Sequence, residues 1–177
     1  MTTITLPLSH LLAANEFVSK DKTRYYLNGV YLHARDNKIH AVATDGHRLI
    51  DIPSIEYSGD MAVIVPSDAI KKLKAVKHIA EVKITIDALK LKIEYAGMTI
   101  NCDAIDATYP DYMRVKPSGD VVAIPSIGFN AKYLGDFAKV NKLLGLSTHI
   151  KFEFFGTGSP CRITTDLYDA VLMPVRI

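Results

Sequence analysis

One supersecondary pattern recurs three times along the chain and limits its fold more than any other feature. Each unit has a short apolar strand, then a helix, then three strands joined by tight turns. Pro7 and Ser9 are typical of a helix start, and Asp45-Gly46 is a strong hairpin signal. The first unit is expected to have a strand at 4–6, a helix from Pro7 and Ser9 to about 18, and strands at 24–34, 39–43 and 47–52.

The same order returns twice. The second unit is predicted to have a strand at 62–65, a helix from 66–67 to about 78, and strands near 81–87, 89–95 and 98–105. The third has strand residues at 121–129, a helix from 130 to about 144, and strands near 148–155, 160–165 and 168–175. Asn130 is an N-cap candidate for that helix, and Gly145 is expected to stop it.

The repeated unit predicts an α+β fold in which antiparallel sheets carry few helices. A ferredoxin-like β-α-β arrangement is the alternative, but three strands after each helix fit it poorly. Residues 116–120 contain Pro, Ser and Gly and have the composition of a boundary. The chain would then hold three units of about 52, 45 and 57 residues.

Composition excludes several classes. The chain has 177 residues, of which 49% are apolar and 23% charged, so neither a disordered chain nor a coiled coil is expected. Its formal net charge of +2 gives no global bias toward nucleic acid. Cys102 and Cys161 are read as buried thiols of a cytosolic protein. Because no membrane-length apolar run or signal pattern is found, a cytoplasmic location and no membrane partner are expected.

Candidate catalytic and metal sites are weak. His33, His40 and His47 recur every seven residues but fall on strands without a carboxylate or Cys cluster, so they are interpreted as solvent-facing. Ser9, His10 and Asp45 lack the turn that a nucleophile needs. Residues 156–158 resemble part of a phosphate loop, yet they connect two strands and are interpreted as a hairpin turn. We therefore expect no enzyme activity, metal or cofactor. A small hydrolase ranks behind the two functions considered below.

Lysines gather in the second and third predicted helices and just after the first, whereas many acidic residues fall in strands and turns. The second helix carries four lysines within seven residues, from Lys71 to Lys77. A solvated helix face explains any one such cluster, but all three helices share the bias. This segregation would allow a nearly neutral protein to present one basic face to phosphates.

Five separated motifs resemble the bacterial replication sliding clamp family, the β subunit of DNA polymerase III. They are Arg24-Tyr-Tyr-Leu-Asn-Gly29, Ala43-Thr-Asp-Gly-His-Arg-Leu49, Tyr109-Pro-Asp-Tyr-Met-Arg-Val115, Ile127-Gly-Phe-Asn130 with Tyr133, and Met173-Pro-Val-Arg-Ile177. The first three resemble the family's middle domain, and the last two the second half of its last domain.

The resemblance implies a ring protein with sheets outside and helices lining a hole through which duplex DNA passes. Basic helices would contact phosphates without reading sequence. The candidate DNA-binding residues are Lys20, Lys22, Arg24, Tyr25, Lys71, Lys72, Lys74, Lys77, Lys132, Lys139 and Lys142.

The resemblance also implies a groove that binds short peptides of DNA polymerase, clamp loader and other replication proteins. Leu27, Leu49, Val115, Val171 and Met173 would form its apolar floor. The candidate peptide-binding residues are Arg24, Tyr26, Leu27, Thr44, Gly46, His47, Arg48, Leu49, Pro110, Val115, Asn130, Tyr133, Pro160, Val171, Met173, Pro174, Val175 and Arg176. Ordinary core packing is the alternative explanation for each of them singly.

The chain departs from the family in having three units instead of six. Residues 1–118 are expected to form a complete clamp-type domain and 119–177 half of one, completed by another chain. Two chains would pair their third units about a two-fold axis, and four chains would supply the twelve units of a ring. The alternative function is a clamp-derived interaction module, of chromosomal or mobile-element origin, that binds such peptides or a host clamp without encircling DNA.

Overall fold

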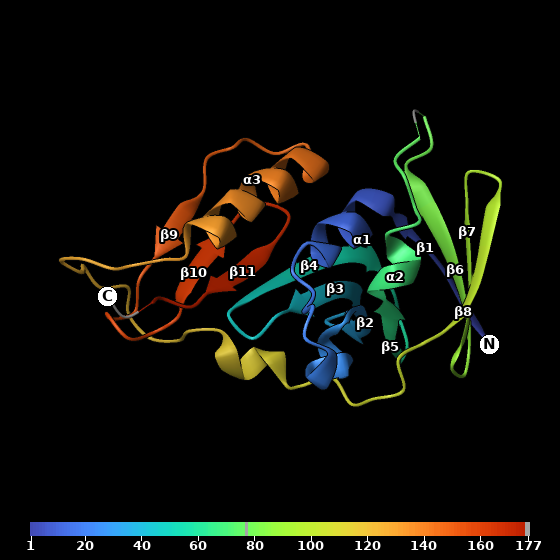
Figure 1. Cartoon of the computed structure of the whole chain (residues 1–177), viewed down its shortest axis with the longest axis horizontal. Helices are drawn as coiled ribbons and strands as arrows, with labels where there is room; N and C mark the ends of the chain where they lie inside the picture. The colour runs from blue at the N-terminus through green and yellow to red at the C-terminus, as the bar shows by residue number, and fades with distance from the viewer. Residues whose placement is uncertain (77, 176–177) are drawn as a thin grey trace.

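Two antiparallel sheets form the framework of the computed structural model, which describes residues 1–76 and 78–175 (Figure 1). The strand order is β1-β6-β7-β8 in the smaller sheet and β5-β2-β3-β4-β11-β10-β9 in the larger. The smaller sheet lies at the N-terminal end of an elongated molecule, and β9–β11 lie at the other end. The α-helices lie on one side of the larger sheet (Figure 1), and the opposite side is the outer face.

The elements follow the predicted order. The strands are β1 (Thr2–Pro7), β2 (Gly29–Arg35), β3 (Lys38–Thr44), β4 (Arg48–Glu56), β5 (Ala62–Pro66), β6 (Glu81–Asp87), β7 (Lys90–Tyr95), β8 (Met98–Asp103), β9 (Lys151–Glu153), β10 (Cys161–Thr164) and β11 (Asp169–Leu172). The helices are α1 (Leu8–Asn15), α2 (Ser67–Ile70) and α3 (Ala131–Leu144), with 3-10 helices η1 (Lys22–Leu27) and η2 (Tyr112–Val115). The α+β class with antiparallel sheets and few helices is confirmed.

The main core lies between the larger sheet and the helices. Phe17, which follows α1, and Phe137 of α3 are both fully buried, and their rings meet edge to face at 5.2 Å. The third unit joins the first through β4 and β11, where Leu49 lies opposite Val171 and Ile50 opposite Ala170. Through this pairing, strands that come before and after residues 116–120 in the sequence form one continuous sheet.

Local signals place α3 as predicted. The Asn130 side chain accepts a hydrogen bond from the Lys132 amide at 3.0 Å, which satisfies a free donor at the helix start. Gly145 follows the last helical residue with φ of 70°, a left-handed conformation that favours glycine.

The segment predicted as strand 24–34 begins instead with η1. The Asp21 side chain accepts hydrogen bonds from the amide and hydroxyl of Thr23, at 2.9 and 2.7 Å. This capping holds the chain in a turn, and β2 begins only at Gly29. The helix α1 likewise ends at Asn15 instead of near Val18.

The predicted helix from 66 to 78 is wrong beyond its first turn, because α2 ends at Ile70. The Tyr95 hydroxyl accepts from the Val76 amide at 2.9 Å and donates to the Ile79 carbonyl at 3.1 Å. These bonds replace the partners that a continuing helix would supply. Lys71 and Lys72 therefore lie in a turn, and Lys74 lies in an irregular segment.

The predicted strand at 121–129 is not formed. Its backbone contacts are Val122 N to Phe154 O and Val175 N to Gly128 O, both at 2.8 Å. The third unit therefore has its helix and three strands but not its first strand. Within residues 1–76 and 78–175, no helix combines the length and apolarity needed to cross a membrane.

Candidate functional site

Strand β4 separates the two candidate surfaces because its successive side chains point to opposite faces. Ile50 packs into the main core beneath the helices, and Arg48 points to that same side. Leu49 belongs to a second apolar cluster on the outer face. The residues predicted to form one peptide groove are consequently divided between the two faces of the larger sheet.

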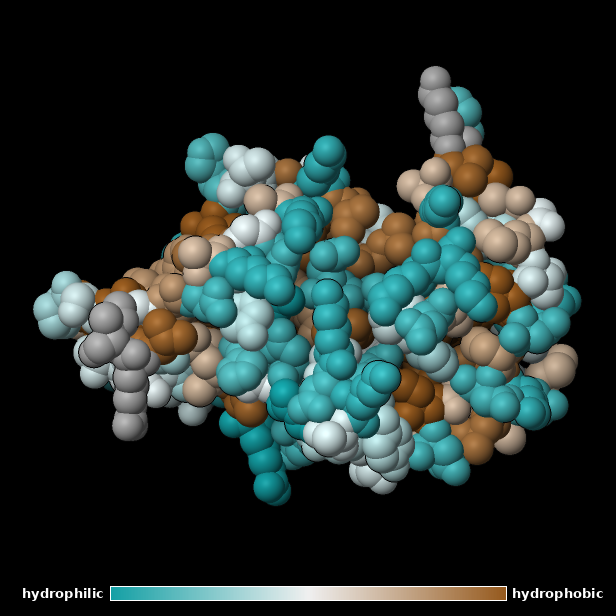
Figure 2. Space-filling model, viewed as in Figure 1, coloured by the Kyte–Doolittle hydropathy of each residue, from teal (hydrophilic) through white to brown (hydrophobic). Residues whose placement is uncertain are grey.

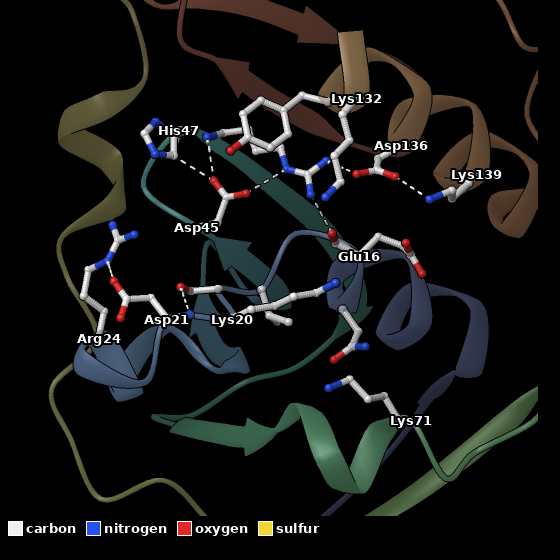
Figure 3. Close-up of a pocket in the computed structure, with 15 residues that line it drawn as sticks. Glu16, Lys20, Asp21, Arg24, Asp45, His47, Lys71, Lys132, Asp136 and Lys139 are labelled. Carbon is white, nitrogen blue, oxygen red and sulfur yellow. Dashed lines mark hydrogen bonds and ion pairs between the residues drawn. The ribbon is translucent and has the colours of Figure 1, made fainter. Parts of the chain in front are cut away.

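A cleft of about 470 Å³ lies on the helix side, where α1, η1 and α3 meet. Figure 3 shows cations from several segments directed toward it. Its charged lining consists of Lys20, Arg24, Arg48, Lys71, Lys132 and Lys139, with Glu16, Asp21, Asp45 and Asp136. Figure 2 shows hydrophilic side chains gathered over this central part of the molecule.

Arg48 organises the floor of this cleft. It is 6% exposed and donates to Asp136 at 2.8 Å, to Asp45 at 3.1 Å and to the Glu16 carbonyl at 2.9 Å. Its guanidinium also lies 4.4 Å from the Phe17 ring centre and 4.6 Å from that of Tyr133. These partners use its donors, so Arg48 connects α1, β4 and α3.

The charge of Asp136 is fixed by the same contacts. Burial alone would raise the pKa of this carboxyl, but hydrogen bonds from Lys139 and Arg48 outweigh burial and lower the pKa below its ordinary value. Lys139 forms an ion pair with Asp136, so its charge is partly neutralised. Arg24 is likewise paired with Asp21 at 3.1 Å. The cleft is therefore basic but partly neutralised.

The predicted DNA-binding residues are brought together only in part. Lys20, Arg24, Lys71, Lys132 and Lys139 line the cleft, and Lys22 and Tyr25 line an adjoining hollow that Lys20 and Lys71 share. Lys72, Lys74 and Lys142 are exposed but line neither. Lys77 lies outside the described residues.

The outer face carries an apolar cluster beside a shallow hollow. The buried cluster consists of Leu27, Val42, Leu49, Ile64, Tyr109, Tyr112 and Val171. Val115, Pro160 and Met173 line the hollow, and Val115 and Met173 are 44% and 37% exposed. Leu27, Leu49 and Val171 are thus core residues, whereas Val115 and Met173 present apolar surface to solvent.

The remaining peptide candidates lie around the β3–β4 turn and the ends of the third unit. Thr44 accepts from the Gly46 amide at 3.1 Å and donates to the Arg48 carbonyl at 2.7 Å. A Cβ on Gly46, whose φ is 90°, would collide with Arg24 Nη1. The Met173 amide donates to the His47 carbonyl at 2.8 Å, which ties the hollow to that turn.

Other candidates have different positions. Arg24, His47, Arg48 and Tyr133 line the helix-side cleft, and Asn130 caps α3. Tyr26 packs against the outer cluster, Pro110 and Val175 are exposed, and Pro174 is half-buried. Arg176 lies outside the described residues.

A buried polar network on the outer face was missed by sequence reasoning. Asp51 is 1% exposed and contacts His40 at 2.6 Å, Lys116 at 2.7 Å and Arg35 at 3.1 Å. Lys116 also contacts Asp169 at 3.0 Å, so it joins β4 to β11. His40 and Asp51 are diagonal neighbours across the predicted hairpin, and that spacing was the available signal.

The histidine interpretation needs correction. His40 is 3% exposed rather than solvent-facing, because Asp51 satisfies its ring nitrogen in the interior. His33 is half-buried and contacts the Tyr112 hydroxyl at 2.9 Å, whereas His47 is exposed as expected. Among the described residues, no group of three or more His, Cys, Asp or Glu could hold a metal ion.

The catalytic candidates are likewise separated. His10 contacts Ser54 at 2.9 Å, and Asp45 contacts Arg48, so no Ser9-His10-Asp45 relay is assembled. Gly156 and Gly158 lie between β9 and β10, as the hairpin interpretation requires. Cys102 and Cys161 are free thiols, Cys161 being buried and Cys102 half-buried, and burial raises the pKa of Cys161 to about 12.

Comparison with known proteins agrees with this architecture. Residues 8–111 match the family model described as the DNA polymerase III beta subunit, central domain. The beta sliding clamp of Caulobacter vibrioides strain NA1000 is 38% identical over 109 residues, which are 56% of this chain and 29% of that protein. That of Rickettsia bellii is 38% identical over 109 residues, 56% of this chain and 28% of that protein. The matched segments thus span less than a third of these relatives.

Solved clamps match nearly the whole fold. The DNA polymerase sliding clamp of Pseudomonas aeruginosa, solved with a ligand, superposes with a TM-score of 0.79 at 21% identity, covering 99% of this chain and 66% of the other. The DNA polymerase III subunit beta of Borrelia burgdorferi superposes with a TM-score of 0.82 at 17% identity, covering 100% of this chain and 65% of the other. Because the central-domain model covers more than half of the sequence and these folds extend through the third unit, the chain belongs to the DNA polymerase III beta subunit family.

Proposed function

We propose that this chain is a non-catalytic, cytoplasmic processivity factor whose assembled copies encircle duplex DNA. The observation that carries the proposal is the convergence of cations from α1–η1, the α2 turn and α3 on one helix-side cleft. Lysines on flexible stems neutralise phosphates without reading base edges, which is the contact a sliding protein needs. Membership of the clamp family supports this use of the surface.

The outer face would bind peptides of DNA polymerase and clamp-loader proteins. Val115 and Met173 supply exposed apolar rims, and Leu49 and Val171 belong to the buried apolar cluster of the same face. Met adapts to different apolar anchors, and a small exposed hollow can hold a short motif. The two activities then use opposite faces of one sheet.

Assembly is part of the proposal. Residues 1–118 act as a complete clamp-type domain, and 119–177 as half of one that a second chain completes. Dimers join through their third units, and four chains supply the twelve units of a closed ring.

Topological retention on DNA is the test of encirclement. Protein loaded on nicked circular DNA should remain bound in high salt and be released when the circle is linearised, because a ring leaves only at an end. Lys20→Glu with Lys132→Glu should weaken binding to circular DNA, whereas Lys74→Glu, outside the cleft, should have less effect. Equal release from circular and linear DNA would contradict encirclement.

Peptide binding is tested with the exposed rim. Val115→Ala with Met173→Ala should weaken binding of a short clamp-binding peptide of DNA polymerase roughly tenfold or more. Retention on DNA should stay intact. Leu49→Ala is unsuitable, because this side chain is 2% exposed and its loss would destabilise the fold. If the double variant bound peptide normally, the groove would lie elsewhere.

One observation favours the second candidate function, an interaction module that binds peptides or a host clamp without encircling DNA. Four carboxylates line the same cleft as six cations. Three of the cations form ion pairs there: Arg24 with Asp21, and Arg48 and Lys139 with Asp136. Peptide binding in the absence of topological retention would establish this module instead.

A further inference from the structure

The first two units each donate their first strand to the other. β1 precedes α1 but pairs antiparallel with β6 of the second unit. β5 precedes α2 but pairs antiparallel with β2 of the first. Each three-stranded set thereby gains a fourth strand, and the exchange is reciprocal.

The exchanged strands share one register relative to the helix that follows them. Apolar residues stand four and two positions before the first helical residue: Ile4 and Leu6 before Leu8, and Val63 and Val65 before Ser67. These four side chains are at most 7% exposed. They lie opposite apolar residues of the receiving strand, namely Ile84, Val82, Leu32 and Val30.

The third unit carries the same signal without the strand. Ile127 and Phe129 stand four and two positions before Ala131, the first residue of α3, yet both are only half-buried. The preceding Val121 and Val122 are 60% and 41% exposed. The donor segment, residues 124–129, therefore has the sequence of an exchanged strand but forms an isolated bridge, between Gly128 and Val175, in place of a strand.

The free edge that such a donor segment could join is the outer edge of β9. Among the described residues β9 pairs only with β10, and it ends the order of the larger sheet. Ile150, Phe152 and Phe154 alternate along this edge and are half-buried. Figure 2 shows apolar surface at this end of the molecule. A backbone bond from Val122 to Phe154 covers part of the edge.

We propose that two copies join their third units about a two-fold axis by exchanging donor segments, each forming a strand antiparallel to the partner's β9. This rests on the oligomer of the proposed function and specifies how its copies join. The register follows from the equivalence of Ile93 and Ile163, whose partners across the next turn, Ile100 and Ala170, each lie seven residues further on. Ile84, which receives Ile4, lies opposite Ile93, and Phe152 lies opposite Ile163. Ile127 then lies opposite the partner's Phe152, and Phe129 opposite the partner's Ile150.

A second copy fits this edge better than an unrelated partner. Each copy both lacks a strand and carries one, so a two-fold pair fills both edges with identical contacts. The outward positions also agree, since Ser126 would face the partner's Glu153 and Gly128 the partner's Lys151 without a like charge. An unrelated occupant of β9 would leave Ile127 and Phe129 unpaired.

Cross-linking tests the register directly. In a Cys102→Ser background, one variant carries Ser126→Cys and another Glu153→Cys, and the two are mixed and treated with a short bismaleimide. A covalent dimer containing one of each is expected, because the two outward positions lie opposite each other between copies. Ser126→Cys mixed with Lys92→Cys, on the distant smaller sheet, should give none.

Mass measurement completes the test. Light scattering at micromolar concentration should give twice the 19.5 kDa of one chain, or four times that mass where two dimers close the ring of the proposed function. Ile127→Asp should raise the dimer dissociation constant about 100-fold or more, because the interface buries the new carboxylate twice, whereas the uncharged change Ser126→Asn should change it little. Near-ultraviolet circular dichroism of both variants verifies that the fold is retained.

Each outcome separates the inference from the proposed function. A monodisperse monomer would overturn both the exchange and the assembled clamp. A dimer that gave no Ser126–Glu153 cross-link would overturn the exchange alone. A cross-linked dimer that failed to stay on circular DNA would support the exchange and overturn encirclement.

Discussion

The two ends of the molecule are built from the same unit but are stabilised differently. In residues 2–103 two units exchange their first strands, and the side chains of those strands are buried. In residues 121–175 the equivalent segment forms no strand, and the unit is held by the β4–β11 pairing and by Arg48 and Lys116. The stability of the third unit thus depends on its junction with the first unit more than on its own sheet.

Equivalent deletions should show this difference most strongly. Leu6 is fully buried, and Leu6→Ala should lower the free energy of unfolding by about 3–5 kcal/mol. Phe129, two residues before α3, is only half-buried, so Phe129→Ala should cost about 1–2 kcal/mol in dilute solution. Urea unfolding followed by circular dichroism measures both. Equal costs in dilute, monomeric protein would show that the third unit is already complete.

The junction should be sensitive to loss of Arg48. Arg48→Met leaves Asp45 without its cation and leaves Asp136 with Lys139 alone, and this loss of a buried partner should cost about 3 kcal/mol. Amide exchange should accelerate in α3 and β11 but not in β6–β8, because the hydrogen-bond partners of Arg48 lie at the end of α1, in the β3–β4 turn and on α3, away from the smaller sheet.

Arg24→Met is the matched control, since Arg24 pairs only at the surface with Asp21 and should cost about 0.5 kcal/mol or less. Uniform acceleration of exchange through both sheets after Arg48→Met would contradict a local junction.

Acid should weaken the outer side of the same junction. Burial opposes ionisation of Asp51, but hydrogen bonds from His40 and Lys116 and their charges hold its pKa well below the ordinary 3.8. Because the pKa is lowered on folding, this carboxylate stabilises the protein above about pH 4, and the contribution is lost as pH falls toward the folded-state value. The loss should be on the order of 2 kcal/mol.

Urea midpoints measured from pH 7 to pH 3 test this dependence. Asp51→Asn should be less stable at pH 7, and its urea midpoint should fall less steeply as the pH is lowered. Asp103→Asn, which removes only an exposed contact with Lys90 in the smaller sheet, should follow the parent curve. A fall as steep as the parent's in Asp51→Asn would show that other carboxylates dominate.

These differences mark how far the sequence could predict the structure. The α3 boundaries were predictable because Asn130 and Gly145 act on their own helix ends. The end of α2 was not, because the Tyr95 hydroxyl that replaces its helix bonds comes from β7. The donor segment has a strand sequence, but a strand also needs a neighbouring edge.

The candidate site was predictable by residue identity and less so by placement. The basic cleft was anticipated through lysine content, although the shortened α2 moves Lys72 and Lys74 away from it. Arg48 and Leu49 were assigned to one groove, yet the strand pleat sends them to opposite faces. Lys116 was assigned to a linker because its partners Asp51 and Asp169 are distant in sequence.

The smallest expected effects separate the helix of the third unit from its junction. Gly145 has φ of 70°, so Gly145→Ala should lower the free energy of unfolding by about 1 kcal/mol. Gly135, inside α3, has open space around a new Cβ, so Gly135→Ala should raise that free energy by about 0.5–1 kcal/mol. Urea unfolding and amide exchange in α3 measure both changes. If Gly135→Ala also slowed exchange in β6–β8, the two ends would unfold as one cooperative body, and the difference between them would concern packing alone.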